Sequence, residues 1–379
     1  MNIGIDIRSL MTKNKTGVGE YTDNLLNAIF LLDKKNNYYL FYNSHKNQEK
    51  NIPRYPYDNV HYVCLKYSNK LLNLGLFLNL IQIQKLIDVP LDWWYSPNFN
   101  FLSLSKNIHR LLTVHDLSFE LFPEFYTIKQ RLWHWAIRPR RQCQLANVII
   151  TPSENTKRDL VDYYKIKPEK IKVIYPGISP DFSLTENKLS ELKSLIIKKY
   201  NLPENFILFI GSIEPRKNIP TLIKAFEKLP ANISNEYSLI IVGATGWKNN
   251  DIYKLATKSS ISNKIKFLGY IPNNEKPAFY ALSQLFVFPS YYEGFGFPIV
   301  EAMTMKTPII SSNRSSLSEI SNDSVYLINP NRPDELNHAI KKIITENPLK
   351  KHLIEKGFLT SQQFSWTKAA AQWLDILEN

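Results

Sequence analysis

The chain has 379 residues, of which 44% are hydrophobic and 21% are charged, a composition typical of a folded globular protein and not of a disordered chain. One hydrophobic core rarely serves more than about 250–300 residues, so this length predicts two domains. The net charge is +13, and residues 1–182 carry 24 Lys and Arg against 16 Asp and Glu, an excess of +8. Such an excess favours phosphorylated ligands or anionic membrane surfaces. Binding to nucleic acid is disfavoured, because the chain has no zinc-ligand spacing, no aromatic pattern of RNA recognition and no basic heptad region.

The expected compartment follows from the cysteines and the N-terminus. The chain has two cysteines, Cys64 and Cys143, which are too few for a disulfide framework, and this is typical of a reducing compartment. No run of eighteen apolar residues is present, and residues 1–8 have the pattern of a buried strand without the basic start of a signal peptide. We therefore expect a cytoplasmic protein.

In the first half of the chain, apolar strand-like runs alternate with helical patterns. The expected strands are residues 3–7, 38–42, 93–95, 110–114, 148–151 and 171–174. This alternation predicts an α/β domain with a doubly wound parallel sheet. Ligands bind beyond the carboxyl ends of the strands in such sheets, so residues that directly follow a strand are candidates for a site.

Three groups of candidates follow strands in this half. Arg8 ends the first strand, and Gly17 and Gly19 belong to a glycine-containing loop before a helix expected from Thr22. Such glycines can bring backbone N–H groups to a phosphate, although a flexible turn explains them equally well. The fourth strand ends in a His-Asp pair, which could be catalytic or could be a local hydrogen-bonded turn, at His115 and Asp116.

Two further segments of this half have unusual surfaces. Residues 126–141 contain five basic side chains, no acidic one, and Trp133 and Trp135. An amphipathic basic helix of this kind can lie on a membrane surface, but the tryptophans could instead pack into the core. Residues 70–88 offer an apolar helical face around Leu71, Leu74, Leu78 and Ile81. If either face is exposed, a lipid-linked ligand is expected.

The second half repeats the α/β pattern after a polar linker. Residues 176–204 hold a Pro-Gly pair, a polar helix and an Asn-Leu-Pro turn. The strands expected beyond this linker are residues 206–210, 238–242, 265–267, 285–288 and 308–311. Residues 361–378 form an amphipathic pattern with two tryptophans, which predicts a C-terminal helix.

The first motif of the second half lies between a strand and a helix. Residues 211–218 read Gly-Ser-Ile-Glu-Pro-Arg-Lys-Asn and lead into a helix expected over residues 220–229. Arg216 and Lys217 could neutralise the charge of a leaving phosphate, which requires fixed cations or a metal. Solvated ion pairs at the start of a helix would be the structural alternative.

The second motif is the most informative segment of the chain. Residues 288–301 read Phe-Pro-Ser-Tyr-Tyr-Glu-Gly-Phe-Gly-Phe-Pro-Ile-Val-Glu, a strand end followed by a glycine-rich loop and a helix start with Pro298 in its first turn. Two glycines permit a close approach to the backbone, and the first N–H groups of the helix favour an anion. Glu293 and Glu301 bracket the loop and can accept hydrogen bonds from sugar hydroxyls.

These two strings resemble the retaining glycosyltransferases of family 4, which have the GT-B fold. The family pattern has two glutamates separated by seven residues around Gly-Phe-Gly-Phe/Leu-Pro, and a Gly-x-x-Glu-Pro-Arg-Lys-Asn phosphate-binding segment. Some members carry Arg where this chain has Ser212, which leaves open whether Arg216 or Lys217 makes the main phosphate contact. The resemblance covers nearly the whole chain and is sharpest over residues 211–319.

The resemblance implies two Rossmann-like domains that face each other across a cleft. An acceptor-binding domain is expected over residues 1–180 and a linker over residues 181–204. A domain that binds the nucleotide sugar is expected over residues 205–360, and residues 361–379 are expected to cross back onto the first domain as a helix.

The resemblance also assigns roles to the candidate residues. The catalytic residues are expected to be His115, Glu293, Arg216 and Lys217. Donor binding is expected from Gly17, Gly19, Gly211, Arg216, Lys217, Gly294, Phe295, Gly296, Phe297 and Glu301. Arg8 and Asp116 are candidates for acceptor binding. No metal is expected, because the cations neutralise the diphosphate and the chain has no Asp-x-Asp motif.

The motifs look most like those of bacterial mannosyltransferases that build surface polysaccharides such as O-antigen. The expected reaction moves a hexose, with GDP-mannose as first choice of donor, to a saccharide acceptor that could be lipid-linked, at the inner face of the cytoplasmic membrane. A UDP-hexose donor, a sugar-nucleotide epimerase of the same fold and a non-catalytic sugar-nucleotide-binding scaffold are the alternatives. No further cofactor is expected.

Overall fold

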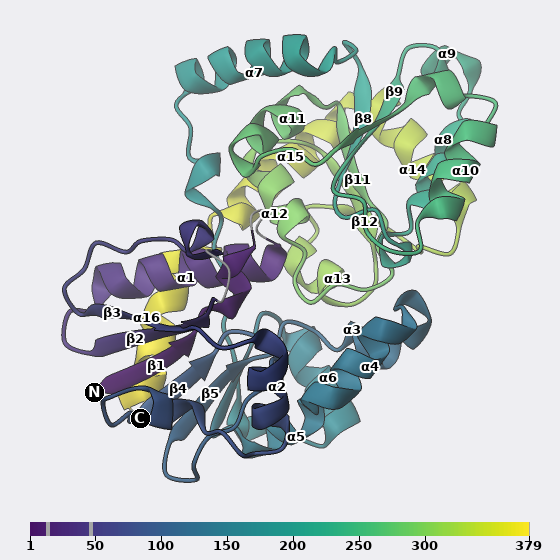
Figure 1. Ribbon diagram of the computed structural model, residues 1–379. Coiled ribbons are helices and arrows are strands. Elements are labelled where there is room, and N and C mark those ends of the chain that lie inside the picture. The colour runs from purple at the N-terminus through teal and green to yellow at the C-terminus, as the bar shows by residue number, and fades with distance from the viewer. Residues whose placement is uncertain (13–15, 45–47, 379) are drawn as a thin grey trace. The chain divides into compact units, whose positions relative to one another are not determined.

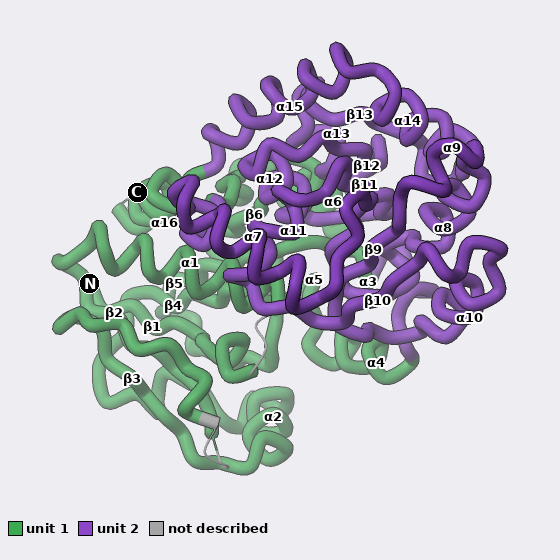
Figure 2. Tube along the Cα trace, turned by 90° about the horizontal axis from the view of Figure 1, so that it is seen from above, with its two compact units in different colours: residues 1–119, 128–177, 365–379 green, residues 120–127, 178–364 purple. Residues whose placement is uncertain are grey.

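The computed structural model describes residues 1–12, 16–44 and 48–378, and the chain divides into two compact units (Figure 2). Unit 1 comprises residues 1–119, 128–177 and 365–379, and unit 2 comprises residues 120–127 and 178–364. Each unit is built on its own parallel sheet (Figure 1).

Unit 1 contains a seven-stranded parallel sheet. Its strand order is β3-β2-β1-β4-β5-β6-β7, so the direction of winding reverses between β1 and β4, which makes the sheet doubly wound. The strands are β1 (Asn2–Asp6), β2 (Asn37–Asn43), β3 (Val60–Leu65), β4 (Trp93–Ser96), β5 (His109–Thr113), β6 (Val148–Thr151) and β7 (Ile171–Val173). The six strands predicted for this half are confirmed. The sequence analysis missed β3, an edge strand whose side chains are mostly only half-buried and which therefore lacks a strong apolar pattern.

Strand β4 shows why both faces of this sheet are covered. Successive side chains of a strand point to opposite faces. Trp94 belongs to an apolar cluster with Leu72 and Leu76 of helix α2 (Asn69–Phe77), whereas Tyr95 packs edge-on against Trp373 of helix α16 (Trp366–Glu378) at 5.2 Å between ring centroids. Helices α2 and α16 therefore lie on opposite faces of the sheet.

The helices of the first half differ from the predictions in two places. Helix α1 (Gly17–Leu32) begins five residues before the predicted Thr22, because Thr16 caps it by accepting a hydrogen bond from the Gly19 amide. Residues 126–141 form two helices, α4 (Ile128–Ile137) and α5 (Pro139–Leu145), which are separated at Arg138 with φ 52°. Pro139 cannot continue α4, since it lacks the N–H that the helix requires. The remaining α-helices of this half are α3 (Ser118–Leu121) and α6 (Glu154–Tyr164).

Unit 2 contains a six-stranded parallel sheet with the order β10-β9-β8-β11-β12-β13. Its strands are β8 (Phe206–Ile210), β9 (Ser238–Val242), β10 (Ile265–Gly269), β11 (Leu285–Phe288), β12 (Ile309–Ser312) and β13 (Tyr326–Ile328). Every residue of β8, β9, β11 and β12 is buried, as expected for inner strands of a sheet that has helices on both faces. The five predicted strands are confirmed, and only the short edge strand β13 was missed.

Nine α-helices are described in unit 2. They are α7 (Glu186–Tyr200), α8 (Ile219–Glu227), α9 (Ala231–Ser234), α10 (Asn250–Lys258), α11 (Lys276–Leu282), α12 (Phe297–Thr304), α13 (Ser316–Ser321), α14 (Pro333–Thr345) and α15 (Asn347–Ser361). Short 3-10 turns connect elements throughout the described chain, at Arg8–Met11, Gln48–Asn51, Ile83–Leu86, Pro123–Phe125, Pro168–Lys170, Pro180–Phe182, Pro215–Lys217, Ser262–Lys264 and Asn273–Glu275.

The C-terminal helix returns to unit 1, as predicted. Helix α16 packs beside α1, where Trp366 contacts Tyr21 edge-on at 5.4 Å between ring centroids (Figure 1). The helix begins at Trp366 and not at residue 361, because α15 continues to Ser361. Gly177 lies against the start of α16, and a Cβ atom at this position would come within 2.1 Å of the Trp366 backbone nitrogen.

Residues 120–127 belong to unit 2, although the sequence analysis placed them in the N-terminal domain. The Phe125 carbonyl accepts a hydrogen bond from Trp247 Nε1 at 2.6 Å, and the Phe125 ring stacks on Tyr291 at 5.6 Å. Aromatic contacts made by this segment thus reach the loop that carries Glu293.

Among the described residues, no helix is both long enough and apolar enough to cross a membrane. Both cysteines, Cys64 and Cys143, are free.

Candidate active site

The two motifs of unit 2 follow neighbouring strands at the switch point of the sheet. Strand β8 leads into residues 211–218, and strand β11, which pairs with β8, leads into residues 289–296. The strand order reverses between β8 and β11, so both loops leave the carboxyl edge where open α/β sheets bind their ligands.

A buried ion-pair cluster joins the two loops. Lys217 Nζ lies 2.6 Å from Glu293 Oε1, and Arg216 Nη1 lies 2.9 Å from Glu293 Oε2. Arg216 also pairs with Glu214 at 2.9 Å and donates a hydrogen bond to the Tyr292 carbonyl at 2.6 Å. All four charged side chains are at most 13% exposed. The alternative of solvated ion pairs at this helix start is therefore wrong.

The cluster contains two cations and two carboxylates, so its charges balance. Burial alone would raise the pKa of Glu293, but the positive charges of Arg216 and Lys217 outweigh it and lower this pKa to about 2. Glu293 is therefore a carboxylate at neutral pH. The Arg216 guanidinium contacts Glu214, Glu293 and the Tyr292 carbonyl. The ammonium group of Lys217 has three N–H donors but makes only one hydrogen bond within the described residues.

Three polar residues to which the sequence analysis assigned no role, one in the first motif and two at the start of α13, hold the loops in place. The buried Asn218 donates hydrogen bonds to the carbonyls of Pro289 and Pro330, at 3.1 and 2.7 Å. Ser315 Oγ accepts from the Glu293 amide at 2.9 Å, and Ser316 Oγ donates to the Glu293 carbonyl at 2.8 Å. Ser315 adopts φ 53°, a backbone strain of the kind that often marks functional loops. The backbone of Glu293 is thus fixed on both sides.

Glu214 is the charged member of the cluster that the sequence analysis left without a role. It lies two residues before Arg216 in the same motif, and this spacing was the available signal.

One glycine of the glycine-rich loop is required by the backbone conformation and the packing around it. Gly296 adopts φ 109°, and a Cβ atom there would lie 2.7 Å from Leu317 Cδ2. Pro298 in the first turn of α12 has no N–H, and the Ile299 amide donates to the Gly296 carbonyl at 2.9 Å. Helix α12 therefore offers fewer amide groups to an anion than the motif alone predicted.

The other residues predicted to bind the donor lie in different surroundings. Phe295 is 4% exposed and packs against Phe364, so its side chain belongs to the core. Phe297 is partly buried against the same core, Gly294 is buried in the loop, and Gly211 directly follows β8.

Glu301 lies one turn into α12 and is 6% exposed. Its Oε2 accepts a hydrogen bond from the Tyr280 hydroxyl at 2.8 Å, and Lys276 Nζ lies 3.6 Å from its Oε1. Lys276 is a further cation of this region that the sequence analysis did not identify. Both partners come from α11, so two neighbouring helices orient this carboxylate.

In unit 1, His115 follows β5 near the switch point of the first sheet. Its Nε2 lies 2.9 Å from the Pro97 carbonyl, and Tyr21 of α1 contacts its ring edge-on at 4.7 Å. Burial lowers the pKa of His115 to about 4, although the Asp116 charge and the Pro97 hydrogen bond act to raise it. The ring is therefore neutral at pH 7. Because a carbonyl only accepts, Nε2 carries the proton and Nδ1 is left as an acceptor.

The remaining candidates of unit 1 already have partners within that unit. Arg8 pairs with the buried Asp6 at 2.6 Å and donates to the Phe101 carbonyl at 2.8 Å. Asp116 accepts hydrogen bonds from the Ser118 amide and hydroxyl, at 2.9 and 2.6 Å. Gly17 and Gly19 lie in the first turn of α1 and not in a loop before it, and the Gly19 amide is used by Thr16.

The structure thus brings Arg216, Lys217 and Glu293 into one cluster and places Glu301 beside Tyr280 and Lys276 in the same unit. His115, Asp116, Arg8, Gly17 and Gly19 lie in unit 1. Within the part of the chain that the structure describes, no group of three or more His, Cys, Asp or Glu side chains is arranged to hold a metal ion.

Two family models match the chain, one in each half. Residues 16–182 match the model "Glycosyltransferase Family 4", and residues 193–360 match the model "Glycosyl transferases group 1". The O-antigen chain mannosyltransferase B of Escherichia coli is 29% identical over 284 residues, which are 74% of this chain and 73% of that protein. The serotype-specific mannosyltransferase WbdA of Escherichia coli is 29% identical over 258 residues, or 68% of this chain, and the match spans about a third (32%) of its own length.

Solved structures show the same fold over the whole chain. Sucrose-phosphate synthase from Thermosynechococcus elongatus has a TM-score of 0.75 at 19% identity and covers 100% of this chain and 98% of its own. HepE from Anabaena, in complex with UDP and glucose, has a TM-score of 0.73 at 19% identity, and the match covers 100% of this chain and 99% of HepE. The two family matches, the two doubly wound sheets and the returning C-terminal helix agree with one another. The chain therefore belongs to the glycosyltransferases of family 4, has the GT-B fold and is close to bacterial mannosyltransferases.

Proposed function

We propose that this glycosyltransferase is a retaining mannosyltransferase that moves mannose from GDP-mannose to a saccharide acceptor during synthesis of a surface polysaccharide such as O-antigen. The observation that carries the proposal is the buried cluster of Arg216, Lys217 and Glu293 at the switch point of unit 2, in a chain whose relatives include O-antigen mannosyltransferases. Buried charges are costly to desolvate, and a cluster of this kind is better explained by a ligand than by stability.

The cations are suited to stabilise the diphosphate that leaves the donor. The bond between the anomeric carbon and the phosphate oxygen breaks, and the electron pair stays on the phosphate. Lys217 is the better candidate for the main phosphate contact, because it has donors that the described residues do not use, whereas Arg216 is held by three partners. We therefore propose Lys217, and not Arg216, for the phosphate contact that the sequence motif left open.

Glu293 is suited to hold the donor sugar in position and not to attack its anomeric carbon as a nucleophile. Both of its carboxylate oxygens are paired with cations, and its low pKa makes it a weak base. We therefore favour front-face attack, in which the acceptor oxygen bonds to the anomeric carbon on the side that the phosphate leaves and the acceptor proton passes to a phosphate oxygen. Glu293 would then accept hydrogen bonds from the sugar while it holds the two cations in place.

Glu301 and His115 are assigned to donor recognition. The Glu301 carboxylate, oriented by Tyr280 and Lys276, would accept hydrogen bonds from the ribose hydroxyls. The unprotonated Nδ1 of His115 would accept from a sugar hydroxyl. We propose that the reaction needs no metal, since Arg216, Lys217 and Lys276 supply fixed positive charge.

The acceptor is proposed to be lipid-linked, and the enzyme to work at the inner face of the cytoplasmic membrane. Exposed apolar side chains support this location. Trp135 is 73% exposed, so the alternative in which both tryptophans pack into the core is wrong, and Leu71, Leu74 and Leu78 of the α2 region are each more than half exposed.

A donor panel tests the proposal. Slow nucleotide release without acceptor would be measured from GDP-, UDP-, ADP- and dTDP-sugars in EDTA, beside the Glu301→Ala protein. Release from GDP-mannose that the variant loses supports the proposal, and release from a UDP-hexose alone would replace the donor. If no donor gives release or a thermal shift, a non-catalytic scaffold becomes the better hypothesis. The anomeric configuration of the product, read by NMR, decides between retention and inversion.

A further inference from the structure

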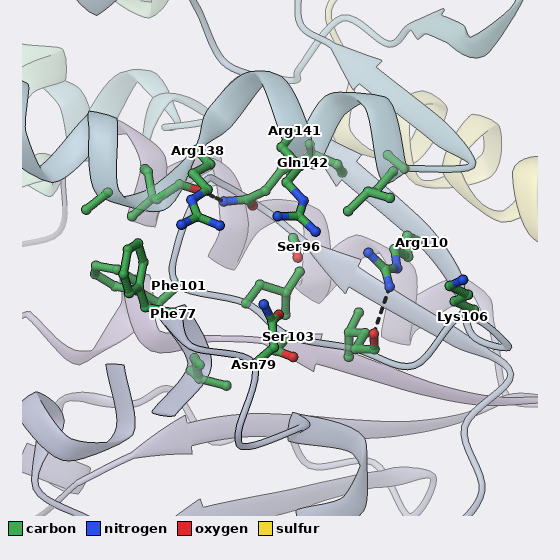
Figure 3. Close-up of a pocket in the computed structure, with 18 of the residues that line it drawn as sticks. Phe77, Asn79, Ser96, Phe101, Ser103, Lys106, Arg110, Arg138, Arg141 and Gln142 are labelled. Carbon is green, nitrogen blue, oxygen red and sulfur yellow. Dashed lines mark hydrogen bonds between the residues drawn. The ribbon is translucent and has the colours of Figure 1, made fainter. Parts of the chain in front are cut away.

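Unit 1 contains a cavity of about 210 Å³ that none of the candidate donor or catalytic residues lines. Its walls are the end of α2, the segment after β4 that includes Phe101 and Leu102, strand β5 and helix α5 (Figure 3). A cavity of this volume holds far more than one water molecule, which needs only about 10–15 Å³.

The polar part of the cavity is cationic. Lys106, Arg110, Arg138 and Arg141 line it, and the described residues that line it include no Asp or Glu. Figure 3 shows the guanidinium groups of the three arginines directed into the cavity. In the described chain, none of these four cations forms an ion pair with a carboxylate.

Arg110 and Arg138 are held in place without loss of their charge. Arg110 donates hydrogen bonds to the carbonyls of Leu104 and Ser105, at 2.9 and 3.1 Å, and neither carbonyl neutralises it. The Arg138 guanidinium lies over the Phe77 ring at 4.6 Å, where the left-handed backbone between α4 and α5 places it. Burial, and then the nearby like charge of Arg141, lower the pKa of Arg110.

The other part of the cavity is apolar. Leu76, Phe77, Phe101, Leu102 and Leu145 contribute to its walls. Leu76 belongs to the core cluster beneath α2, while Leu78 and Leu80, next to the cavity residue Asn79, are 51% and 78% exposed. Exposed apolar side chains therefore flank a residue of the cavity wall on the outside of unit 1. Gln142 adds a buried side-chain oxygen that accepts no hydrogen bond from the described residues.

We propose that this cavity binds an alkyl phosphate ester, with its phosphate or diphosphate on Arg110, Arg138 and Arg141 and its alkyl chain along the wall formed by Phe77 and Phe101. Guanidinium groups match the geometry of phosphate oxygens, and a chain of CH₂ groups is the ligand part that apolar walls favour. The class of ligand follows from the cavity alone, whereas its role as the anchored end of a lipid-linked acceptor rests on the proposed function.

Isothermal titration calorimetry with decyl phosphate, below its critical micelle concentration, tests whether the cavity binds an alkyl phosphate. The variant Arg138→Ser/Arg141→Ser removes two cavity cations, and Arg131→Ser/Arg140→Ser is the matched control, since it removes the same charge from exposed positions of α4 and α5 that do not line the cavity. We expect one binding site, a loss of affinity of about tenfold or more in the cavity variant, and less than a twofold change in the control.

Three results would overturn the proposal. Equal losses in both double variants would mean nonspecific attraction to a basic surface, and inorganic phosphate that binds as tightly as decyl phosphate would mean a site for a small anion. Arg141→Ser alone guards against misfolding, because Arg141 is exposed on α5 and has no left-handed backbone. A folded Arg141→Ser protein with unchanged affinity for decyl phosphate would also contradict the assignment of Arg141 to the phosphate site.

Two further experiments distinguish a membrane phospholipid from a lipid-linked acceptor, and test the cavity assignment independently of the proposed function. Loss of sedimentation with phosphatidylglycerol vesicles in the cavity variant would identify a membrane phospholipid as the ligand, whereas unchanged sedimentation with lost decyl phosphate binding supports a lipid-linked acceptor. Nucleotide release without acceptor does not involve the cavity and should be equal in wild type and cavity variant. If release is absent while decyl phosphate binds, the proposed function fails and the cavity assignment stands.

Discussion

Lys217 Nζ lies 2.6 Å from Glu293 Oε1 although 76 residues separate the two side chains in the chain. The contact exists because β8 and β11 are neighbours in the sheet, so the loops that follow them leave the same edge. It joins a cation suited to a leaving phosphate to a carboxylate suited to a sugar.

Lys217→Ala should lower turnover by about 100-fold and change donor affinity much less. The charge on the leaving phosphate develops in the transition state, so a cation that meets it there acts mainly on the rate. Steady-state kinetics with saturating donor measures the effect. Lys228→Ala is the control, because Lys228 is exposed and pairs with the exposed Asp334. Wild-type turnover in Lys217→Ala would remove this residue from the mechanism.

Glu301→Ala should raise the dissociation constant of the donor nucleotide by about tenfold, because hydrogen bonds from ribose hydroxyls to a carboxylate are lost. Calorimetric titration with the nucleoside diphosphate measures it directly. Tyr280→Phe serves as a companion variant, since it removes the hydroxyl that orients Oε2 but keeps the carboxylate, and a smaller effect is expected. Unchanged nucleotide affinity in Glu301→Ala would contradict the ribose assignment.

Glu293→Gln should make unfolding less sensitive to acid. The pKa of Glu293 is lowered from 4.5 to about 2 in the folded protein, so its ionised form contributes stability above pH 4.5, and this contribution is lost as the pH falls from 4.5 toward 2. The shift corresponds to about 3 kcal/mol at most. Denaturant midpoints of wild type and variant, compared at pH 6 and pH 3, should converge at the lower pH, and a constant difference would argue against the ion pairs.

His115→Asn should reduce the loss of stability between pH 6.5 and pH 4. The pKa of His115 is lowered to about 4, so in this window the unfolded chain binds a proton that the folded protein does not, and stability falls as the pH falls. An NMR titration of the histidine C2 protons gives an independent check, since one resonance should titrate near pH 4 and disappear in the variant. A His115 resonance that titrates near pH 6.5 would show that the ring is not desolvated.

Gly296→Ala and Gly17→Ala separate structural from ligand-binding glycines. Gly296→Ala should cost about 1–3 kcal/mol in unfolding free energy, because φ 109° is unfavourable for alanine and its Cβ would lie 2.7 Å from Leu317. Gly17→Ala should leave stability unchanged or raise it, because no atom of the described residues lies within 4 Å of the added Cβ. Thermal unfolding measures both, and reduced donor affinity in a stable Gly17→Ala protein would place the donor near the start of α1.

The sequence alone determined the two sheets and the positions of the motifs. Inner strands such as β8 and β11 are continuous apolar runs because helices cover both faces, and local signals such as Pro298 mark where a helix starts. The edge strands β3 and β13 were missed because edge strands need no such run, and the start of α1 was misplaced because the hydrogen bond between Thr16 and Gly19 outweighs the low helix propensity of glycine.

Only the tertiary structure decided how the charges are partnered. The motif indicated cations for a phosphate, but the pairing of Arg216 with Glu214 and Glu293 depends on the packing of two loops that are remote in sequence. In the same way, nothing in the local sequence shows that Arg110 and Arg141 line one cavity while Arg140, next to Arg141, does not. Strand and helix patterns are set by neighbouring residues, whereas burial and the choice of an ionic partner are set by contacts that form only when the chain folds.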